Sequence, residues 1–182
     1  MGQTTLTELS QPKFPPLLLC LPGETDAAAR LLAVHHCGKS LLFHQIMHYR
    51  SVGADQIMLS VEAVSGSLLA LIDELGGRGI HVDIVRSPNE ILTKPAPAST
   101  CLVAQAEIWF ESEIICQVAA AESPLLATVE EHSENGAFER IDLNNRWAGM
   151  ALIDFDIFKT TSDLPEDWDL GSSLLRQTLQ RN

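Results

Sequence analysis

Short apolar runs alternate with helix-type patterns along the first half of this 182-residue chain. Leu17–Leu21 is continuously apolar between two prolines, as in a strand that is covered on both faces. Gln56–Val61 and Ile80–Val85 are predicted as the second and third strands. Strands that alternate with helices at this spacing form a parallel sheet through right-handed crossovers. The sequence therefore predicts an α/β fold with three α/β/α layers around a mostly parallel, Rossmann-like central sheet.

The connecting segments carry recognisable helix signals. Ser40 is a suitable N-cap for a helix that ends at Gly53. Val64–Leu75 is predicted as the next helix, whereas Leu21–Leu31 and the proline-rich Ser87–Thr100 are predicted as loops. Further strands are expected at Cys101–Ala104, Leu125–Val129, Ile141–Leu143 and Trp147–Ile153, and further helices at Glu111–Ala121 and Asp154–Thr161.

Three segments are expected along the chain. Residues 1–13 are polar and aperiodic and are predicted to form a flexible arm, residues 14–161 one domain, and residues 162–182 an acidic segment with a docking helix. Leu174, Leu175, Thr178 and Leu179 form a narrow apolar stripe on that helix. Since so short a helix is marginal alone, it should dock on the domain, on a partner protein or on a second copy of the chain.

The charge balance excludes some classes of partner. The chain carries 12 Lys and Arg against 24 Asp and Glu, a formal net charge of −12. Such a balance repels phosphate backbones, so nucleic-acid binding is not expected. No run approaches the length of a membrane span, and no signal peptide is recognised. Four widely spaced cysteines without a CxxC pair are predicted to be reduced thiols, which favours a cytoplasmic protein.

The segment after the first strand sits where nucleotide-binding α/β domains place their phosphate loop. It reads LPGETDAAARL, with Gly23 as its one glycine and with two acids, Glu24 and Asp26. Phosphate binding by backbone amides needs repeated close approach of the main chain, which a single glycine does not supply. The position therefore indicates a nucleotide site, whereas the chemistry indicates that the site has changed.

The order of these elements resembles that of the GT-A-like nucleotidyltransferase family over about Pro16–Phe158. The strings that carry the resemblance are CGKSLLFHQIMHYRSVGADQIML, LVAQAE and RWAGMALIDFDIF. The family includes sugar-phosphate, polyol-phosphate and molybdopterin nucleotidyltransferases. The resemblance implies a GT-A-type sheet and transfer of a nucleotidyl group from a nucleoside triphosphate to a phosphorylated small molecule.

The resemblance also implies particular site residues. Gly23 and Arg30 match the glycine-rich stretch and its arginine, so Gly23 would contact substrate and Arg30 would stabilise the phosphates in catalysis. The family's next Pro-Lys pair is absent here. Lys39 lies in a string that matches the family's Gly-Lys-Pro-Leu-Leu helix opening, and it would contact substrate.

The implied cofactor is Mg²⁺, which prefers oxygen ligands. Glu107 stands where the family has a metal-binding aspartate after the fourth strand of the sheet. Asp142, Asp154 and Asp156 are candidates for the second ligand, of which Asp154 is the first choice because it follows the WAGMALI strand.

Two functions remain open from the sequence. The first is a divergent nucleotidyltransferase that uses Mg²⁺, and the second is a catalytically inactive relative that serves as a binding or scaffolding module. The acidic loop and the missing lysine favour the second. A dinucleotide-binding Rossmann protein is disfavoured, because no Gly-x-Gly-x-x-Gly follows the first strand.

Overall fold

The computed structural model describes residues 14–21, 25–94, 99–161 and 170–181. In chain order the elements are β1 (Leu17–Cys20), α1 (Thr25–Ala33), β2 (His35–His36), β3 (Lys39–Ser40), α2 (Leu41–Ser51), β4 (Ile57–Ser60), α3 (Gly66–Gly77), β5 (Val82–Val85), α4 (Pro88–Leu92), β6 (Thr100–Gln105), α5 (Ser112–Ala119), β7 (Leu125–Glu130), the 3₁₀ helix η1 (Ser133–Asn135), β8 (Asn145–Asp154), α6 (Ile157–Thr161) and α7 (Leu170–Arg181).

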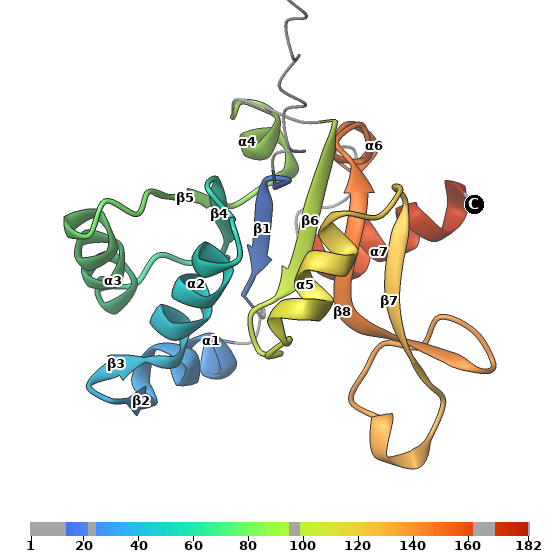
Figure 1. The fold of residues 1–182 in the computed structure, drawn as a ribbon, viewed down its shortest axis with the longest axis horizontal. Coiled ribbons are helices and arrows are strands. Elements are labelled where there is room, and N and C mark those ends of the chain that lie inside the picture. The colour runs from blue at the N-terminus through green and yellow to red at the C-terminus, as the bar shows by residue number, and fades with distance from the viewer. Residues whose placement is uncertain (1–13, 22–24, 95–98, 162–169, 182) are drawn as a thin grey trace, which may run out of the picture.

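Six of the strands form one sheet in the order β5-β4-β1-β6-β8-β7 (Figure 1). The strands β5, β4, β1 and β6 are parallel, and β8 runs antiparallel between β6 and β7. The chain passes from β1 to β4 on one side and later to β6 on the other, so β1 lies at the reversal of strand order. The predicted α/β fold with a mostly parallel sheet is confirmed.

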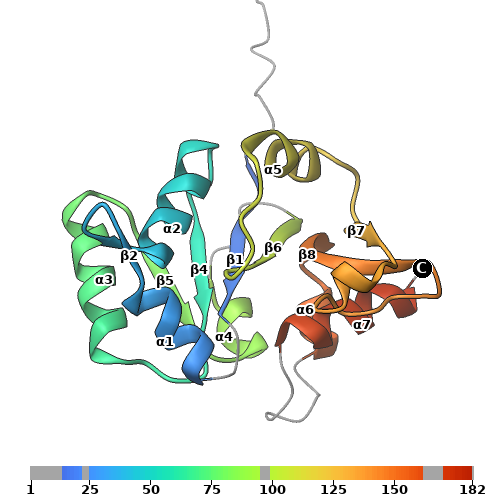
Figure 2. The ribbon, with the colours of Figure 1, turned by 90° about the horizontal axis from the view of Figure 1, so that it is seen from below.

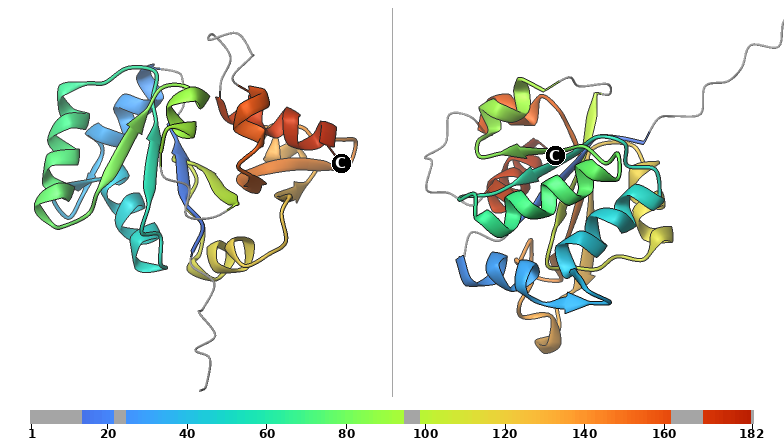
Figure 3. Two further views of the ribbon diagram at one scale, coloured as in Figure 1. Left: turned by 90° about the horizontal axis from the view of Figure 1, so that it is seen from above. Right: turned by 90° about the vertical axis from the view of Figure 1, so that its left-hand side faces the viewer.

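Helices cover both faces of this sheet, as Figures 2 and 3 show. In β1, Leu17 and Leu19 face a core formed with α2, α3 and α5, whereas Leu18 and Cys20 face a second core formed with α4, α6 and α7. Each of the three leucines is completely buried. Burying a leucine side chain contributes about 1.5–3 kcal/mol, so this continuous apolar run stabilises both layers at once.

A serine side chain caps the start of α2, as predicted at Ser40, and another serine caps the start of α3. The Oγ of Ser40 accepts a hydrogen bond from the amide of Phe43 at 3.2 Å, and the Oγ of Ser65 accepts one from Leu68 at 3.2 Å. Each bond satisfies an amide that has no partner within its helix. The helix predicted from Ser40 is confirmed, and the predicted Val64–Leu75 helix is α3, which begins and ends two residues later than predicted.

Three local predictions are wrong. Most of the expected first loop is the helix α1, because Ala, Arg and Leu from residue 27 to 32 are strong helix formers. The proline-rich loop contains α4, which Pro88 can begin because the first turn of a helix needs no amide donor from it. Ile141–Leu143 is not a strand, since Asp142 accepts hydrogen bonds from the amides of Asn144 and Asn145 and forms a turn.

The carboxy-terminal helix α7 packs on its own chain. Leu174, Leu175 and Thr178 are buried, and the Oγ of Ser172 donates a hydrogen bond to Glu139 at 2.7 Å. The predicted apolar stripe is thus largely covered without a partner, and Leu179 is left 37% exposed. The expected arm at residues 1–13 and the acidic lead-in at residues 162–169 lie outside the described residues, so the proposed boundaries stay predictions.

In the part of the chain that the structure describes, no helix has both the length and the apolar character needed to cross a membrane. All four cysteines are free thiols, with Cys20 and Cys101 buried and Cys37 and Cys116 exposed.

Candidate functional site

A cavity of about 480 Å³ lies at the carboxyl edge of the parallel strands. Leu21 follows β1 and Val61–Ala63 follow β4, and these residues form its floor. Helix α1 and the first turn of α3 form its walls through Ala28, Ala29, Leu32, Ala33, Ser65, Ser67 and Leu68, with His35 at the β2–β3 hairpin. In open α/β sheets, ligands bind outside the carboxyl ends of the strands. This cavity is therefore the leading candidate for a ligand site.

The lining of this pocket is mainly apolar. Its polar groups are the carboxylate of Glu62, the imidazole of His35 and two hydroxyls, those of Ser65 and Ser67, whose Oγ atoms are 3.0 Å apart. Among the described residues, neither lysine nor arginine lines it. The first turn of the twelve-residue helix α3 adds a partial positive charge through its amides. A flat, mostly apolar group with a few hydrogen-bonding atoms, such as a nucleobase, fits this chemistry better than a triphosphate does.

A smaller cavity of about 250 Å³ adjoins the pocket and shares Leu32, His35 and Ser67 with it. Lys39 lines this cavity, and its Nζ is 2.5 Å from the Oε1 of Glu74. Arg78 also contacts Glu74, at 3.2 Å. The hydrogen bond from Lys39, then its charge, and then the hydrogen bond and charge of Arg78 lower the pKa of Glu74 below its usual value.

Lys39 and Arg78 also lie over the ring of Phe43, at 5.6 and 5.0 Å from its centroid. The positive charge of Lys39 is thus balanced by Glu74 and sheltered by an aromatic face. A phosphate that bound Lys39 would have to compete with this ion pair. The expected substrate contact of Lys39 stays a prediction.

The other residues expected to hold phosphate are on or before α1. Arg30 is exposed in the last turn of α1, and it is absent from the pocket lining although its neighbour Ala29 is part of it. Gly23 lies outside the described residues. Most of the expected phosphate loop is therefore the helix α1. The expected role of Arg30 in stabilising phosphates stays a prediction.

Glu107 and Asp154 lie at opposite ends of the paired strands β6 and β8. Asp154 pairs with Thr100, the first residue of β6, whereas Glu107 follows Gln105, its last residue. At about 3.3 Å per residue, six residues of strand separate the two edges by roughly 15–20 Å. The expected magnesium site formed by Glu107 and Asp154 is therefore wrong, because β8 runs antiparallel to β6 and delivers its carboxyl end to the other edge.

The two alternative aspartates are engaged elsewhere. Asp142 accepts hydrogen bonds from the amides of Asn144 and Asn145 at 2.7 and 2.9 Å, and these bonds lower its pKa, the one from Asn144 most. Asp156 forms an ion pair with Lys159 at 2.6 Å. Across the described ranges, no three His, Cys, Asp or Glu side chains gather as they would around a metal ion.

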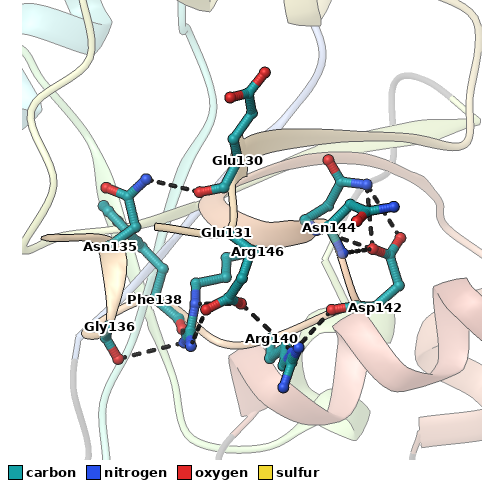
Figure 4. Close-up of polar contacts among 10 residues, drawn as sticks. Glu130, Glu131, Asn135, Gly136, Phe138, Arg140, Asp142, Asn144 and Arg146 are labelled. Carbon is teal, nitrogen blue, oxygen red and sulfur yellow. Dashed lines mark hydrogen bonds and ion pairs between the residues drawn. The ribbon is translucent and has the colours of Figure 1, made fainter. Parts of the chain in front are cut away.

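A charged network that the sequence did not predict stabilises the connection between β7 and β8 (Figure 4). The guanidinium of Arg146 contacts both carboxylate oxygens of Glu131, at 2.8 and 2.9 Å, and also donates to the carbonyl of Phe138 at 2.6 Å. Arg140 approaches the same carboxylate at 3.4 Å. The hydrogen bond from Arg146 is the main cause that lowers the pKa of Glu131.

Sequence reasoning also missed two residues that bound the segment carrying Glu107. Gln45 of α2 donates hydrogen bonds to the carbonyls of Ala106 and Ile108, and Gly149 of β8 adopts a φ of +89° beside them. Both residues stand out from the sequence pattern of their own element. Gln45 is a polar residue inside an apolar helical stripe, and a glycine within a strand often marks close approach of another backbone.

No protein-family model and no curated protein sequence matches the chain. Solved structures do match its fold. The inositol-1-phosphate CTP transferase from T. maritima superposes with a TM-score of 0.66 at 10% identity, over 93% of this chain and 83% of that one. The 4-diphosphocytidyl-2C-methyl-D-erythritol synthase from Anaerococcus prevotii gives 0.59 at 9% identity, over 89% and 82%. HddC from Yersinia pseudotuberculosis, complexed with GMP-PN, gives 0.58 at 13% identity, over 85% and 84%.

The chain has the GT-A-like fold of these solved structures, the first of which is a CTP transferase by its name. The fold that the resemblance implied is confirmed.

Proposed function

We propose that this protein binds a nucleoside triphosphate at the carboxyl edge of its sheet, with the nucleoside in the pocket between α1 and α3. The pocket itself carries the proposal, because its place after β1 and β4, its volume of about 480 Å³ and its apolar lining suit a nucleobase. The hydroxyls of Ser65 and Ser67 and the carboxylate of Glu62 offer hydrogen bonds to base or ribose.

The proposed reaction is nucleotidyl transfer to a sugar phosphate or polyol phosphate. An oxygen of the acceptor phosphate attacks the α-phosphorus, the bond to the β-phosphate oxygen breaks, and pyrophosphate leaves. The fold supports this reaction, since its neighbours include a CTP transferase that acts on inositol 1-phosphate by its name. Arg30 is the exposed cation of α1 and would stabilise the phosphates, with Gly23 and Lys39 as further substrate contacts.

The magnesium site implied by the resemblance does not fit the described residues, because Asp154 is at the wrong edge. We therefore assign no step of the reaction to Mg²⁺. Glu107 is the exposed carboxylate at the correct edge, and one carboxylate with substrate phosphates is an arrangement that Mg²⁺ accepts. A nucleoside triphosphate substrate also agrees with the cytoplasmic location expected from the composition.

A second candidate function is a binding module without catalysis. Among the described residues neither lysine nor arginine lines the pocket, and Lys39 is paired with Glu74, and both observations favour this function. Transfer of a nucleotidyl group develops negative charge that fixed positive groups normally stabilise. A protein that retained the nucleoside pocket but lost these charges would bind nucleotides without turning them over.

Calorimetric titration with each nucleoside triphosphate, with and without Mg²⁺, tests the binding. Release of pyrophosphate in the presence of a panel of sugar and polyol phosphates tests the reaction. Micromolar binding together with pyrophosphate release that falls in Arg30→Gln and Glu107→Gln supports the transferase. Binding without release supports the second candidate. Absence of binding at millimolar concentrations of all triphosphates overturns both.

A further inference from the structure

Glu107 lies in a tight turn that begins at the last residue of β6. The amide of Ile108 donates to the carbonyl of Gln105 at 3.3 Å, and the amide of Ala106 donates to Cys20 of β1 at 2.9 Å. We refer to Gln105–Ile108 as the Glu107 turn. Glu107 itself is exposed, whereas Ala106 is 2% exposed. The turn thus presents one carboxylate to solvent from a backbone that is anchored in the sheet.

Helix α2 holds this turn through Gln45. The Gln45 side chain is buried at 4% exposure, and its Nε2 donates to the carbonyls of Ala106 at 3.3 Å and Ile108 at 2.5 Å. These two carbonyls flank Glu107 on either side. A hydrogen bond shielded from water is stronger than one at the surface, and its loss leaves the carbonyl of a buried residue unsatisfied.

Helix α2 also contacts the residues that follow the Glu107 turn, through His48. The Nε2 of His48 lies 2.8 Å from the carbonyl oxygen of Phe110. The His48 ring also stacks on Trp109, with ring centroids 4.4 Å apart and planes inclined by 19°. Gln45 and His48 therefore attach the backbone to α2 both at the Glu107 turn and beyond it.

Strand β8 bounds the turn through Gly149. A Cβ at this residue would lie 2.4 Å from Cδ1 of Ile108 and 2.9 Å from Oε1 of Gln105. The absence of a side chain lets the first and last residues of the turn pack directly on β8. The turn is consequently enclosed between α2 and β8, and little room remains for an alternative backbone path.

We infer that Gln45 is a positioning residue that fixes the direction of the Glu107 carboxylate at the ligand edge of the sheet. Two hydrogen bonds from one buried amide, to the carbonyls of Ala106 and Ile108, hold the backbone just before and just after Glu107. The inference rests on the proposed function, in which Glu107 meets the bound nucleotide. Replacing the hydrogen-bond partners of metal-binding carboxylates typically costs about 10–100-fold in affinity or activity, and we expect a loss of this order for nucleotide binding here.

The test compares Gln45→Met, Glu107→Gln and the double variant. Methionine has a similar length to glutamine but lacks the donors. Amide hydrogen exchange in the Glu107 turn should accelerate in Gln45→Met, and nucleotide affinity should fall by about 10–100-fold. The double variant should bind no more weakly than Glu107→Gln. Ile46→Val, a core truncation at the next position of α2, is the control and should leave exchange in the turn unchanged. Gln45→Asn provides the same measurements if Gln45→Met does not fold.

Unchanged exchange in the turn of Gln45→Met would overturn the inference, as would additive losses of affinity in the double variant. If the wild-type protein binds no triphosphate, the proposed function fails. Hydrogen exchange then still decides whether Gln45 holds the turn, so the two failures are distinguishable.

Discussion

The segments that follow the two neighbouring strands β1 and β6 differ in what they contribute at the carboxyl ends of the strands, where the ligand is proposed to bind. After β1, helix α1 contributes four alanine and leucine side chains to the wall of an apolar pocket. After β6, the Glu107 turn is bound by Gln45 and enclosed by Gly149. The first segment provides a surface for an apolar group, and the second holds one carboxylate in a fixed direction.

The same difference appears in the charges. Near the pocket, Lys39 and Arg78 both contact the carboxylate of Glu74, which offsets part of their positive charge. Next to β6, Glu107 is exposed, and Gln45 holds the carbonyls of the residues before and after it. The carboxyl ends of the strands therefore carry an apolar surface after β1 and a fixed carboxylate after β6, and Glu74 already contacts the cations Lys39 and Arg78.

The largest effect is expected at Gly149, on the side of the Glu107 turn. Gly149→Ala should lower the free energy of unfolding by about 3 kcal/mol, because the φ of +89° strains an L-residue and the new Cβ would overlap Ile108. Denaturant unfolding measures the change. Gly76→Ala is the matched control, since its Cβ meets nothing within 4 Å and a helical alanine should raise stability by about 0.5–1 kcal/mol. Equal effects at both glycines would show that β8 does not enclose the turn.

On the pocket side, filling the apolar volume should abolish most nucleotide binding. Ala29→Trp places an indole where the nucleoside is proposed to lie, and the affinity should fall by about a hundredfold, equivalent to about 2.7 kcal/mol. Calorimetric titration checks this. Ala120→Trp, at an exposed position after α5, is the control and should bind as the wild type does. An unchanged affinity in Ala29→Trp would place the nucleotide outside this pocket.

A smaller effect of opposite sign on stability is expected at Tyr49 of α2. Tyr49 is completely buried, burial raises its pKa, and its hydroxyl finds no hydrogen-bond partner among the described residues. Tyr49→Phe removes this unsatisfied group and should raise the free energy of unfolding by about 1 kcal/mol. A loss of stability in denaturant unfolding would instead show that the hydroxyl has a partner, such as a buried water molecule.

The smallest effect is expected in acid, at the Glu131 network of the β7–β8 connection. The hydrogen bond from Arg146 lowers the pKa of Glu131 from its ordinary 4.5 in the folded protein. A carboxyl whose folded pKa is depressed stabilises the fold above its unfolded pKa, and this contribution disappears as pH falls through the folded pKa. The stability difference between wild type and Glu131→Gln should therefore be present at pH 7 and shrink as pH falls below about 4.5.

Unfolding curves across this range measure that difference. In an Arg146→Gln background, Glu131→Gln should show a smaller pH dependence, because Arg146 is the main cause of the shift. A difference that stays constant with pH would contradict the assignment.

Much of the fold follows from local patterns in the sequence. The run Leu17–Leu21 predicts a strand covered on both faces, and its residues do alternate between two cores. The N-caps at Ser40 and Ser65 accept hydrogen bonds from amides three residues away, so neighbouring residues determine where each helix begins. The alanine and leucine content of α1 also favours a helix. A loop was predicted there instead, because the segment stands at the position of a phosphate loop and contains a glycine and two acids.

The candidate site was less predictable, because it joins residues far apart in the chain. The donors of Gln45 reach carbonyls 61 and 63 residues away, which no local pattern reveals. The placement of Asp154 failed for a similar reason. Its strand was predicted correctly, but whether β8 runs parallel or antiparallel to β6 decides which edge receives its carboxyl end.

The sequence by itself determined the alternation of strands and helices and the two-sided burial of β1, since both follow from apolar periodicity and from capping within a few residues. Only the tertiary structure decided what the ligand edge contains. Pairing between β6 and β8 removed Asp154 from that edge, packing of α2 placed Gln45 beneath Glu107, and the ion pair with Glu74 engaged Lys39. These outcomes depend on contacts between distant segments, whose geometry exists only once the sheet has formed.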